Sequence, residues 1–427
     1  MGLLAKSSSR QDPVAISIDF LEHLFAGYGQ RNFHVRFWDG SCWGDSRTPD
    51  FTLVLNHPGA LRTMFLSATE LSIGEAYIYK DFDVEGDLEA AFALSDYLLE
   101  QERGLSRRLH LGTILGRLPA QGRPRPVRKV HGARHSRGRD REAVTYHYDL
   151  PREFFATFLD RRMVYSCAYF VSPEDGLDAA QEKKLDYICR KLRLSPGDRL
   201  LDLGCGWGAL VIHAARRYGA NCLGITLSEP QAAIARERIR QAGVEQRCRV
   251  EVCDYRDLRP DRQFDKMASV GMIEHVGEEL LPQYFRRAWQ LLLPGGVFLN
   301  HGIARSATYR HTGLSFTDVY VFPDGELVPI STTLRQAEQA GFEVRDVESL
   351  REHYALTLHH WLKRLEAGSA AARQASDEIT YRIWKLYIAG SAHWFRTRKL
   401  NIYQSLLSKP THGKSGLPLT RSEWYQG

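Results

Sequence analysis

Residues 201–208 read Leu-Asp-Leu-Gly-Cys-Gly-Trp-Gly, a glycine loop between two segments of opposite character. The apolar run at residues 199–203 is typical of a buried strand, and the spacing at residues 209–218 is typical of a helix. Glycines let the backbone turn tightly beside a ligand, while the following helix presents unpaired N–H groups at its amino terminus. We therefore expect a cofactor to bind over this loop.

Strands and helices alternate beyond the loop, as they do in a parallel sheet. The pattern predicts strands at residues 220–227, 249–253, 264–270 and 297–303, and helices at residues 229–242 and 279–292. From residue 352 to the end it predicts two long helices rich in Trp and Tyr. The predicted fold is α/β, a doubly wound parallel sheet with C-terminal helical additions and ligands at the carboxyl ends of its strands.

The chain before residue 115 has a different character. Short segments typical of strands, at residues 32–39 and 51–56, are mixed with a helical segment, which indicates a small α+β domain. Residues 117–141 then hold nine basic residues and one acidic residue among several prolines and glycines. We predict an N-terminal α+β domain at residues 1–115, a basic flexible linker at 116–142 and a larger domain at 143–427.

Charge and composition restrict the class of protein. The 427 residues carry a net charge of +6, and residues 117–141 alone contribute +8. Three roles are open for that segment: a solvated spacer, a nucleic-acid arm, or a contact for anionic lipid head groups. The sequence contains no apolar stretch long enough to span a membrane, and residues 1–10 lack the apolar core of a signal peptide, so we expect a cytoplasmic protein. The seven cysteines form no Cys-x-x-Cys pair, and we predict neither a metal site nor a disulfide framework.

The spacing of the glycine loop indicates which cofactor binds. Its glycines follow the pattern G-x-G-x-G, one residue shorter than the dinucleotide fingerprint. The second strand ends Gly224-Ile-Thr-Leu-Ser228, without the acidic residue that binds ribose in that fingerprint, so NAD is disfavoured. With Asp202 two residues before the first glycine, the segment resembles motif I of class I S-adenosylmethionine-dependent methyltransferases.

The segment Gly271-Met-Ile-Glu-His-Val-Gly277 bears on the methyl acceptor. Methyltransferases that act on nucleobase amines commonly carry an Asn/Asp-Pro-Pro-aromatic motif here, and this chain does not, so a nucleic-acid substrate is disfavoured. Instead Glu274 and His275 follow one strand, and His301 lies at the end of the next. Groups projected from neighbouring strands can converge on one ligand.

Several segments, in one order along the chain, resemble the cyclopropane fatty acid synthases and the related mycolic acid methyltransferases. They are Tyr146-His-Tyr-Asp149, Tyr165-Ser-Cys-Ala-Tyr-Phe170, Leu201-Asp-Leu-Gly-Cys-Gly-Trp-Gly208, Gly224-Ile-Thr-Leu-Ser228, Asp254-Tyr-Arg-Asp257, Met272-Ile-Glu-His-Val-Gly277 and His301-Gly-Ile303. The resemblance covers residues 146–407, and the N-terminal domain resembles the extra domain of the bacterial members that act on phospholipids. It implies a Rossmann-like class I methyltransferase domain at residues 143–427.

The resemblance implies transfer of a methylene group from S-adenosylmethionine to the cis double bond of unsaturated acyl chains in membrane phospholipids, forming cyclopropane chains. Because an alkene is a poor nucleophile, the enzyme must align it with the sulfonium methyl and stabilise the developing carbocation. In this family the base that then removes a proton is proposed to be a bound bicarbonate. The matching residues here are Cys167, Glu274, His301 and Tyr354, with backbone help at Ile303. A neutral Glu274, with a raised pKa, is expected beside that anion.

The resemblance also implies a set of cofactor-binding residues. They are Tyr165, Ser166, Asp202, Gly204, Gly206, Gly208, Thr226, Leu227, Gln231, Asp254 and Tyr255. Gln231 or Thr226 can bond the ribose hydroxyls, and Tyr255 can lie against the adenine.

One catalytic position departs from the family. Where the family commonly has a cysteine that is regarded as an active-site residue, this chain has Ser391. A serine hydroxyl is much less nucleophilic than a thiolate, so a covalent role would be lost, yet alkene methylation needs no enzyme nucleophile. The change leaves open a methylene- or methyl-branched product, or a non-catalytic sensor that binds S-adenosylmethionine or lipid.

The implied substrate suggests a role for the basic linker. At about 1 kcal/mol per basic residue near an anionic bilayer, part of the +8 segment would provide reversible attachment. We expect an enzyme associated peripherally with the inner face of the membrane, with a phospholipid bilayer as its partner and no nucleic acid. A homodimer formed through the N-terminal domain would fit the family.

Overall fold

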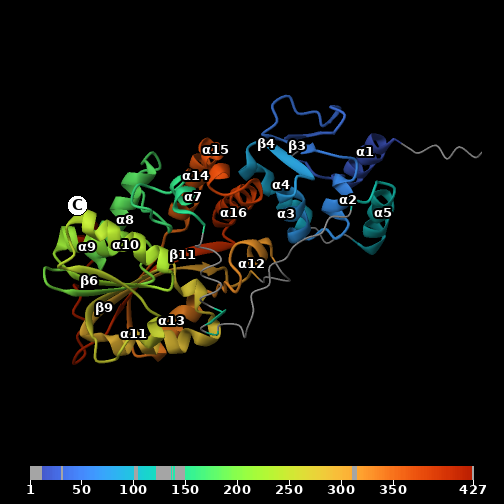
Figure 1. Ribbon diagram of the computed structural model, residues 1–427. Helices are drawn as coiled ribbons and strands as arrows, with labels where there is room; N and C mark the ends of the chain where they lie inside the picture. The colour runs from blue at the N-terminus through green and yellow to red at the C-terminus, as the bar shows by residue number, and fades with distance from the viewer. Residues whose placement is uncertain are drawn as a thin grey trace, which may run out of the picture. The chain divides into compact units, whose positions relative to one another are not determined.

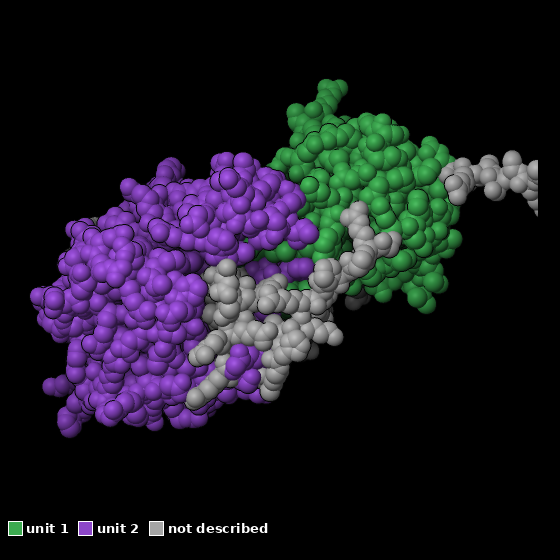
Figure 2. All heavy atoms as spheres, viewed as in Figure 1, with its two compact units in different colours: residues 1–128, 314–319, 382–390 green, residues 129–313, 320–381, 391–427 purple. Residues whose placement is uncertain are grey.

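The computed structural model describes residues 12–29, 32–100, 104–121, 136, 138–139, 150–309 and 315–425, which form two compact units (Figures 1 and 2). Unit 1 comprises residues 1–128, 314–319 and 382–390, and unit 2 comprises the remainder. The predicted boundaries at residues 115 and 142 remain predictions. Most of the predicted linker lies outside the described residues.

Unit 1 is built on a four-stranded sheet in the order β2-β1-β3-β4. Its strands are β1 (Phe33–Arg36), β2 (Cys42–Trp43), β3 (Phe51–Leu55) and β4 (Phe82–Gly86), and its helices are α1 (Pro13–Leu24), α2 (Ala60–Phe65), α3 (Glu70–Ile78), α4 (Leu88–Glu100) and α5 (Leu105–Gly116). Strands β1 and β3 are parallel, and the other two pairs are antiparallel. Stacked rings of Phe33 and Phe51, 5.3 Å apart, hold the middle of its core. The mixture of strands and helices agrees with the α+β character expected of this region.

Unit 2 is built on a seven-stranded sheet in the order β10-β11-β9-β8-β5-β6-β7. Its strands are β5 (Arg199–Leu203), β6 (Asn221–Thr226), β7 (Cys248–Val252), β8 (Phe264–Val270), β9 (Leu292–Arg305), β10 (Glu343–Ser349) and β11 (Leu400–Ser408). The five strands from β7 to β9 in this order are mutually parallel, whereas β11 is antiparallel to both of its neighbours. The expected doubly wound α/β class is therefore confirmed.

Helices cover both faces of this sheet (Figure 1). The helices of unit 2 are α7 (Arg152–Ala156), α8 (Leu177–Lys191), α9 (Ala209–Tyr218), α10 (Glu229–Ala242), α11 (Leu281–Leu291), α13 (Ile330–Gln339), α14 (Arg351–Ala367), α15 (Ser369–Ala375) and α17 (Ser422–Tyr425), with short 3₁₀ turns η1 (Tyr255–Asp257), η2 (Ile273–His275) and η3 (Glu278–Leu280). Helices α12 (Phe316–Tyr320) and α16 (Glu378–Arg396) contribute residues to both units. Adjacent residues of β5 point to opposite faces of the sheet: Leu200 packs with α8, α9 and α10, and Leu201 packs with α11.

The prediction of two long helices from residue 352 to the end is wrong in part. Helices α14 and α16 are present, but the chain then forms β11, which lies between β9 and β10. Consecutive residues of this strand, Gln404 to Leu407, are all buried. A strand covered on both faces shows no alternation of apolar and polar residues, so its periodicity does not reveal it.

Two further observations concern membrane contact. No helix in the described ranges is both long enough and apolar enough to cross a bilayer. Within the predicted basic linker, Arg139 forms an ion pair with Asp324, with Nη2 donating to Oδ1 over 2.7 Å. At least one of the nine basic side chains is therefore engaged by unit 2 itself.

Candidate active site

The glycine loop connects β5 to α9 at the carboxyl edge of the sheet. Gly204, Gly206 and Gly208 all have positive φ, at 79°, 52° and 82°. A Cβ on Gly208 would also come within 3.2 Å of the Ala235 Cβ on α10. The backbone conformation therefore requires glycine at these three positions, and the absence of side chains leaves space for a ligand above the loop.

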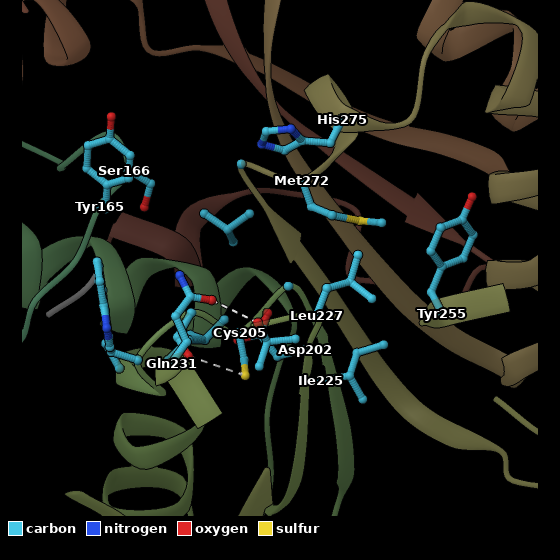
Figure 3. A pocket seen from close by; sticks show the side chains of 18 of the residues that line it. Tyr165, Ser166, Asp202, Cys205, Ile225, Leu227, Gln231, Tyr255, Met272 and His275 are labelled. Carbon is cyan, nitrogen blue, oxygen red and sulfur yellow. Dashed lines mark hydrogen bonds between the residues drawn. The ribbon is translucent and has the colours of Figure 1, made fainter. Parts of the chain in front are cut away.

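A pocket opens above this loop (Figure 3). Ten of the eleven predicted cofactor-binding residues line it: Tyr165, Ser166, Asp202, Gly204, Gly206, Thr226, Leu227, Gln231, Asp254 and Tyr255. Gly208 is outside the lining, at the N-cap of α9. Tyr165 and Ser166 lie on one side of the pocket and Tyr255 lies on the other. The lining comes from segments 90 residues apart, which the fold brings together.

Two residues, Thr226 at the end of β6 and Gln231 on α10, are candidates for binding the ribose hydroxyls, and their hydrogen bonds distinguish between them. The Thr226 hydroxyl donates to Gln231 Oε1 over 2.8 Å and accepts from the Ser228 N–H. These bonds occupy the threonine and fix the glutamine carbonyl, so the Gln231 amide N–H groups are the donors directed to the pocket. Gln231 is therefore the better candidate for a ribose hydroxyl.

Asp254, next to Tyr255, pairs with Arg256, a residue that the sequence analysis did not include in the site. Arg256 forms a bidentate pair with it, with Nε to Oδ1 at 2.9 Å and Nη2 to Oδ2 at 2.6 Å. Arg256 also lines the pocket. It belongs to the quoted segment Asp254-Tyr-Arg-Asp257, where the spacing of acid and base was the available signal. The buried Tyr255 ring packs edge-on against Tyr284 at 5.6 Å, which holds it at the pocket wall.

Asp202 lies beneath the loop as a buried carboxylate. Burial raises its pKa to about 7, and nearby Lys184 opposes that rise. Its Oδ1 is buried and has no hydrogen-bond partner within the described part of the chain. An unpaired buried oxygen that lines a pocket suits a cationic ligand group.

Glu274 belongs to η2, just beyond β8. Its Oε1 accepts a 2.7 Å hydrogen bond from the Ile303 N–H on β9, whereas its buried Oε2 has no partner among the described residues. Burial raises its pKa to about 7, partly offset by that hydrogen bond. The direction of this shift agrees with the expected neutral carboxyl group. Met272, the N-cap residue of η2, and His275, its last residue, line the cofactor pocket.

His301 is completely buried on β9. Gln404 Nε2 on β11 donates to its Nδ1 over 3.2 Å, and burial lowers the pKa of the ring well below its usual value. A neutral ring that accepts at Nδ1 carries its proton on Nε2. That Nε2–H is buried and unpaired in the described ranges. Gln404 is the second positioning residue that the sequence did not suggest, because β11 itself was not predicted.

The Cys167 thiol and the Tyr354 backbone N–H share one acceptor at the start of α14. The buried Cys167 thiol lies 3.8 Å from the Leu350 carbonyl, which also accepts from the Tyr354 N–H at 3.0 Å. Burial raises the pKa of the thiol, so it stays protonated and can donate. Leu350 in turn donates its N–H to Ile402, the β11 residue that pairs with Ile303. Strand β11 therefore joins the Cys167–Tyr354 part of the site to the Glu274–His301 part.

Aromatic contacts connect these residues with the cofactor pocket. Tyr165, which lines the pocket, stacks on Trp361 at 5.2 Å, and Trp361 contacts Tyr354 edge-on at 6.0 Å. Tyr354 then packs on Phe395 of α16 at 4.7 Å. Ser391 is buried one turn before Phe395, and it makes no hydrogen bond to Cys167, Glu274, His301 or Tyr354 in the structure as described. Hydrogen bonds and ring contacts thus link four of the five predicted catalytic residues, and Ser391 lies one helical turn from Phe395, the ring that contacts Tyr354.

Comparison with known proteins identifies the family. Residues 135–405 match the model of mycolic acid cyclopropane synthetases. The chain belongs to this family. Residues 20–99 of this family member match a separate domain family of unknown function.

Relatives of this synthetase-family chain cover most of its length. It is 40% identical over 397 residues to a probable fatty acid methyltransferase of Pseudomonas putida, with 92% of this chain and 96% of the relative covered. It is 36% identical over 275 residues to the cyclopropane-fatty-acyl-phospholipid synthase of Escherichia coli K12, with 64% of this chain and 69% of the relative covered. The expected resemblance is confirmed.

Solved structures agree with this family assignment. The chain is similar to mycolic acid cyclopropane synthase CmaA1 in complex with SAH and CTAB, with a TM-score of 0.59, 34% identity, and coverage of 62% of this chain and 97% of that one. The cyclopropane synthase MmaA2 from Mycobacterium tuberculosis gives a TM-score of 0.60 at 33% identity, with the same coverage. The chain is an S-adenosylmethionine-dependent methyltransferase that modifies lipid acyl chains.

Proposed function

We propose that this enzyme transfers a methylene group from S-adenosylmethionine to the cis double bond of unsaturated acyl chains in membrane phospholipids, forming a cyclopropane ring. The observation that carries the proposal is a pair of buried, unpartnered polar atoms in the described structure, Glu274 Oε2 and His301 Nε2. Both residues contact β9 or belong to it, at the carboxyl edge of the sheet next to the cofactor pocket. Groups of this kind call for a small polar ligand.

The chemistry of the two groups fits an oxyanion. A neutral Glu274 carboxyl and the His301 Nε2–H can both donate, and the protonated Cys167 thiol adds a weak donor. A bicarbonate bound there would supply the base for the reaction. The residues themselves hold that base in place and keep bulk water from it, because Cys167 and His301 are fully buried.

The reaction divides into two bond changes. The alkene attacks the sulfonium methyl, so the C–S bond breaks, a C–C bond forms, and positive charge develops on the second alkene carbon. A proton then leaves the added methyl for the base, and the electron pair of that C–H bond closes the ring. The ring faces of Tyr354, Trp361 and Phe395 are suited to stabilise the positive charge by cation–π attraction.

For the cofactor, we propose that Tyr255 lies against the adenine, Gln231 bonds the ribose, and Asp202 faces the ammonium group. In support, the pocket lining supplies one aromatic, one amide and one carboxylate side chain suited to these three parts of the cofactor.

A second product is favoured by two observations. The Pseudomonas putida relative is named a probable fatty acid methyltransferase, and Ser391 stands where the family commonly has cysteine. Loss of a proton from another carbon of the same carbocation would give a methyl- or methylene-branched chain. Both products arise from one active site, so the choice depends on where the base is held.

We also propose peripheral docking on an anionic bilayer. In support, α5 exposes Leu105 and Leu109, one turn apart and 74% and 65% exposed, with Arg108 between them. Apolar side chains beside basic ones are typical of helices that lie in a membrane interface. The basic segment at residues 117–141 follows α5 directly and would add electrostatic attraction.

The test of the proposed reaction uses purified full-length protein with methyl-labelled S-adenosylmethionine and vesicles of mono-unsaturated anionic phospholipid, with and without bicarbonate. Mass spectrometry of the acyl chains should show the gain of one CH₂, and NMR should show loss of the alkene. A gain with a retained alkene would assign the branched product. No gain, despite measurable cofactor binding, would overturn the proposal in favour of a sensor.

A further inference from the structure

A buried lysine faces the cofactor pocket without a carboxylate partner. Lys184 on α8 is 2% exposed and lines the pocket, yet it forms no ion pair with any described residue. Its Nζ donates instead to the Ser166 hydroxyl over 2.8 Å. Removing an ammonium group from water is costly unless the charge is compensated. Asp160 and Asp202 are close enough to act on the lysine electrostatically, but neither pairs with it directly, and the ammonium group is anchored by the Ser166 hydroxyl at the pocket wall.

Helix α8 holds the pocket segment through two side chains on one face. Gln181, three residues before Lys184, donates from Nε2 to the Ser166 carbonyl over 2.9 Å. The glutamine therefore fixes the backbone of Ser166, and the lysine fixes its hydroxyl. Because an ammonium group can only donate, the Ser166 oxygen is the acceptor, and the hydroxyl hydrogen is left to point at another acceptor.

The surrounding charges keep the lysine positive. Burial lowers the pKa of Lys184 to about 8, while the carboxylates of Asp160 and Asp202 act in the opposite direction, so it is mostly protonated at neutral pH. Ser166 lies across the pocket from Tyr255, the proposed adenine contact (Figure 3). The end of the cofactor that reaches Ser166 is then its amino-acid end, which carries one carboxylate.

We propose that Lys184 is a positioning residue for the cofactor carboxylate: it orients the Ser166 hydroxyl as a donor, and its charge complements the anion. The inference rests on S-adenosylmethionine as the cofactor and on adenine binding at Tyr255, and it is independent of the lipid product. Lys184 lies outside the quoted family-like segments, so the proposal adds a residue that makes the site specific for the cofactor carboxylate.

The test compares two ligands that differ by the carboxylate alone. Calorimetry would measure the affinity of the full chain for S-adenosylmethionine and for decarboxylated S-adenosylmethionine. In Lys184→Met we expect S-adenosylmethionine to bind about 10- to 100-fold more weakly, since a charge-assisted hydrogen bond is lost. The affinity for the decarboxylated ligand should stay within about twofold of the wild type, because that ligand presents nothing for the lysine to assist.

Two further variants keep the result interpretable. Ser166→Ala should show the same selective loss, and the double variant should lose little more than either single one, since the two residues act as a unit. Lys191→Met is the matched control: this lysine is fully buried on the same helix but pairs with Glu348 and Asp346 and does not line the pocket. It should lower stability without changing the ratio of the two affinities.

An equal weakening of both ligands in Lys184→Met would reduce the lysine to a structural role and overturn the proposal. Unchanged selectivity in Ser166→Ala would overturn it independently, even if Lys184→Met fails to fold.

Discussion

Gln404 donates its side-chain amide to Nδ1 of His301 over 3.2 Å, between two strands that are antiparallel neighbours in the sheet. The bond fixes the neutral tautomer of the buried ring, with its proton on Nε2. That proton is the donor proposed to hold the base, so a glutamine 103 residues away in the sequence determines the chemistry of the histidine.

Replacing Gln404 with leucine should therefore reduce kcat while leaving cofactor binding intact. We expect a loss of about 10- to 100-fold in kcat, because the ring loses its orientation and its Nδ1 is left buried and unpaired. Turnover on lipid vesicles and calorimetry with S-adenosylhomocysteine would measure the two quantities. Ser405→Ala, at the adjacent and equally buried position, is the control. A folded Gln404→Leu variant with normal kcat would contradict the assigned role.

Because Glu274 ionises in a buried site, the free energy of unfolding should fall as the pH rises. Its pKa is raised from 4.5 to about 7 by burial, so between these values the folded state binds more protons than the unfolded state, and the free energy of unfolding falls with increasing pH. Glu274→Gln removes this dependence and can still accept from the Ile303 N–H. Relative to the wild type, the variant should gain roughly 2 kcal/mol between pH 5 and pH 8. Urea unfolding at both pH values would measure it, and parallel stability profiles would refute the assignment.

Ser391 should be dispensable for turnover. It is buried on α16, and the methylation of an alkene needs no enzyme nucleophile. We expect Ser391→Ala and Ser391→Cys to keep kcat within about twofold of the wild type, since neither change removes a charged or strongly hydrogen-bonded group. The ratio of cyclopropane to branched product, measured by NMR, is the second readout. A change of product in Ser391→Cys would instead make this position a determinant of the reaction outcome.

The exposed leucines of α5 should contribute to vesicle binding. In Leu105→Ser/Leu109→Ser we expect weaker sedimentation with anionic vesicles, since each leucine contributes about 1.5 to 3 kcal/mol when fully buried in an apolar environment. Thermal stability should be unchanged because both side chains face solvent. Leu419→Ser, a fully exposed leucine of unit 2, is the matched control. Unchanged vesicle binding would contradict docking by α5, and a change in oligomeric state on chromatography would assign the leucines to a dimer interface.

Gly302 leaves space for the turn that carries Glu274. A Cβ at this position would lie 2.2 Å from Cγ2 of Ile273, the residue before Glu274. Gly302→Ala should destabilise the fold by about 1 to 3 kcal/mol and reduce kcat, because η2 must move away from β9. The double variant Ile273→Ala/Gly302→Ala removes the clash and should recover most of the lost kcat. Failure of this rescue, with both variants folded, would show that the clash is not the cause.

Local pattern predicted much of the catalytic domain. The strand at residues 199–203, the helix at 209–218 and the glycine loop between them appear as predicted, and so do the strand at 264–270 and the helix at 229–242. The two helices show a helical period within a short window of sequence, and the buried strand at residues 199–203 is marked by the glycine loop that follows it. The same locality explains why ten predicted cofactor-binding residues line one pocket: they stand at the carboxyl ends of strands or in the segments beside them.

Strand β11 and the side chains that it supplies required the tertiary structure. Residues 404–407 are buried without alternation and begin with the polar Gln404 and Ser405, so neither a strand period nor an apolar run marks this strand in the sequence. Its place between β9 and β10 brings Gln404 to His301 and links Leu350 to Ile402. These contacts connect the two parts of the proposed base site.

The sequence by itself therefore determined the family, the α/β class and the edge of the sheet where ligands bind, because glycine spacing and strand periodicity are properties of contiguous residues. Only the tertiary structure decided how the polar groups are paired. Lys184 meets Ser166, Gln404 meets His301, and Ile303 meets Glu274 because packing of the sheet and its helices places them within hydrogen-bond distance. Burial then changes their protonation, since the loss of water acts on a group only where the folded chain surrounds it.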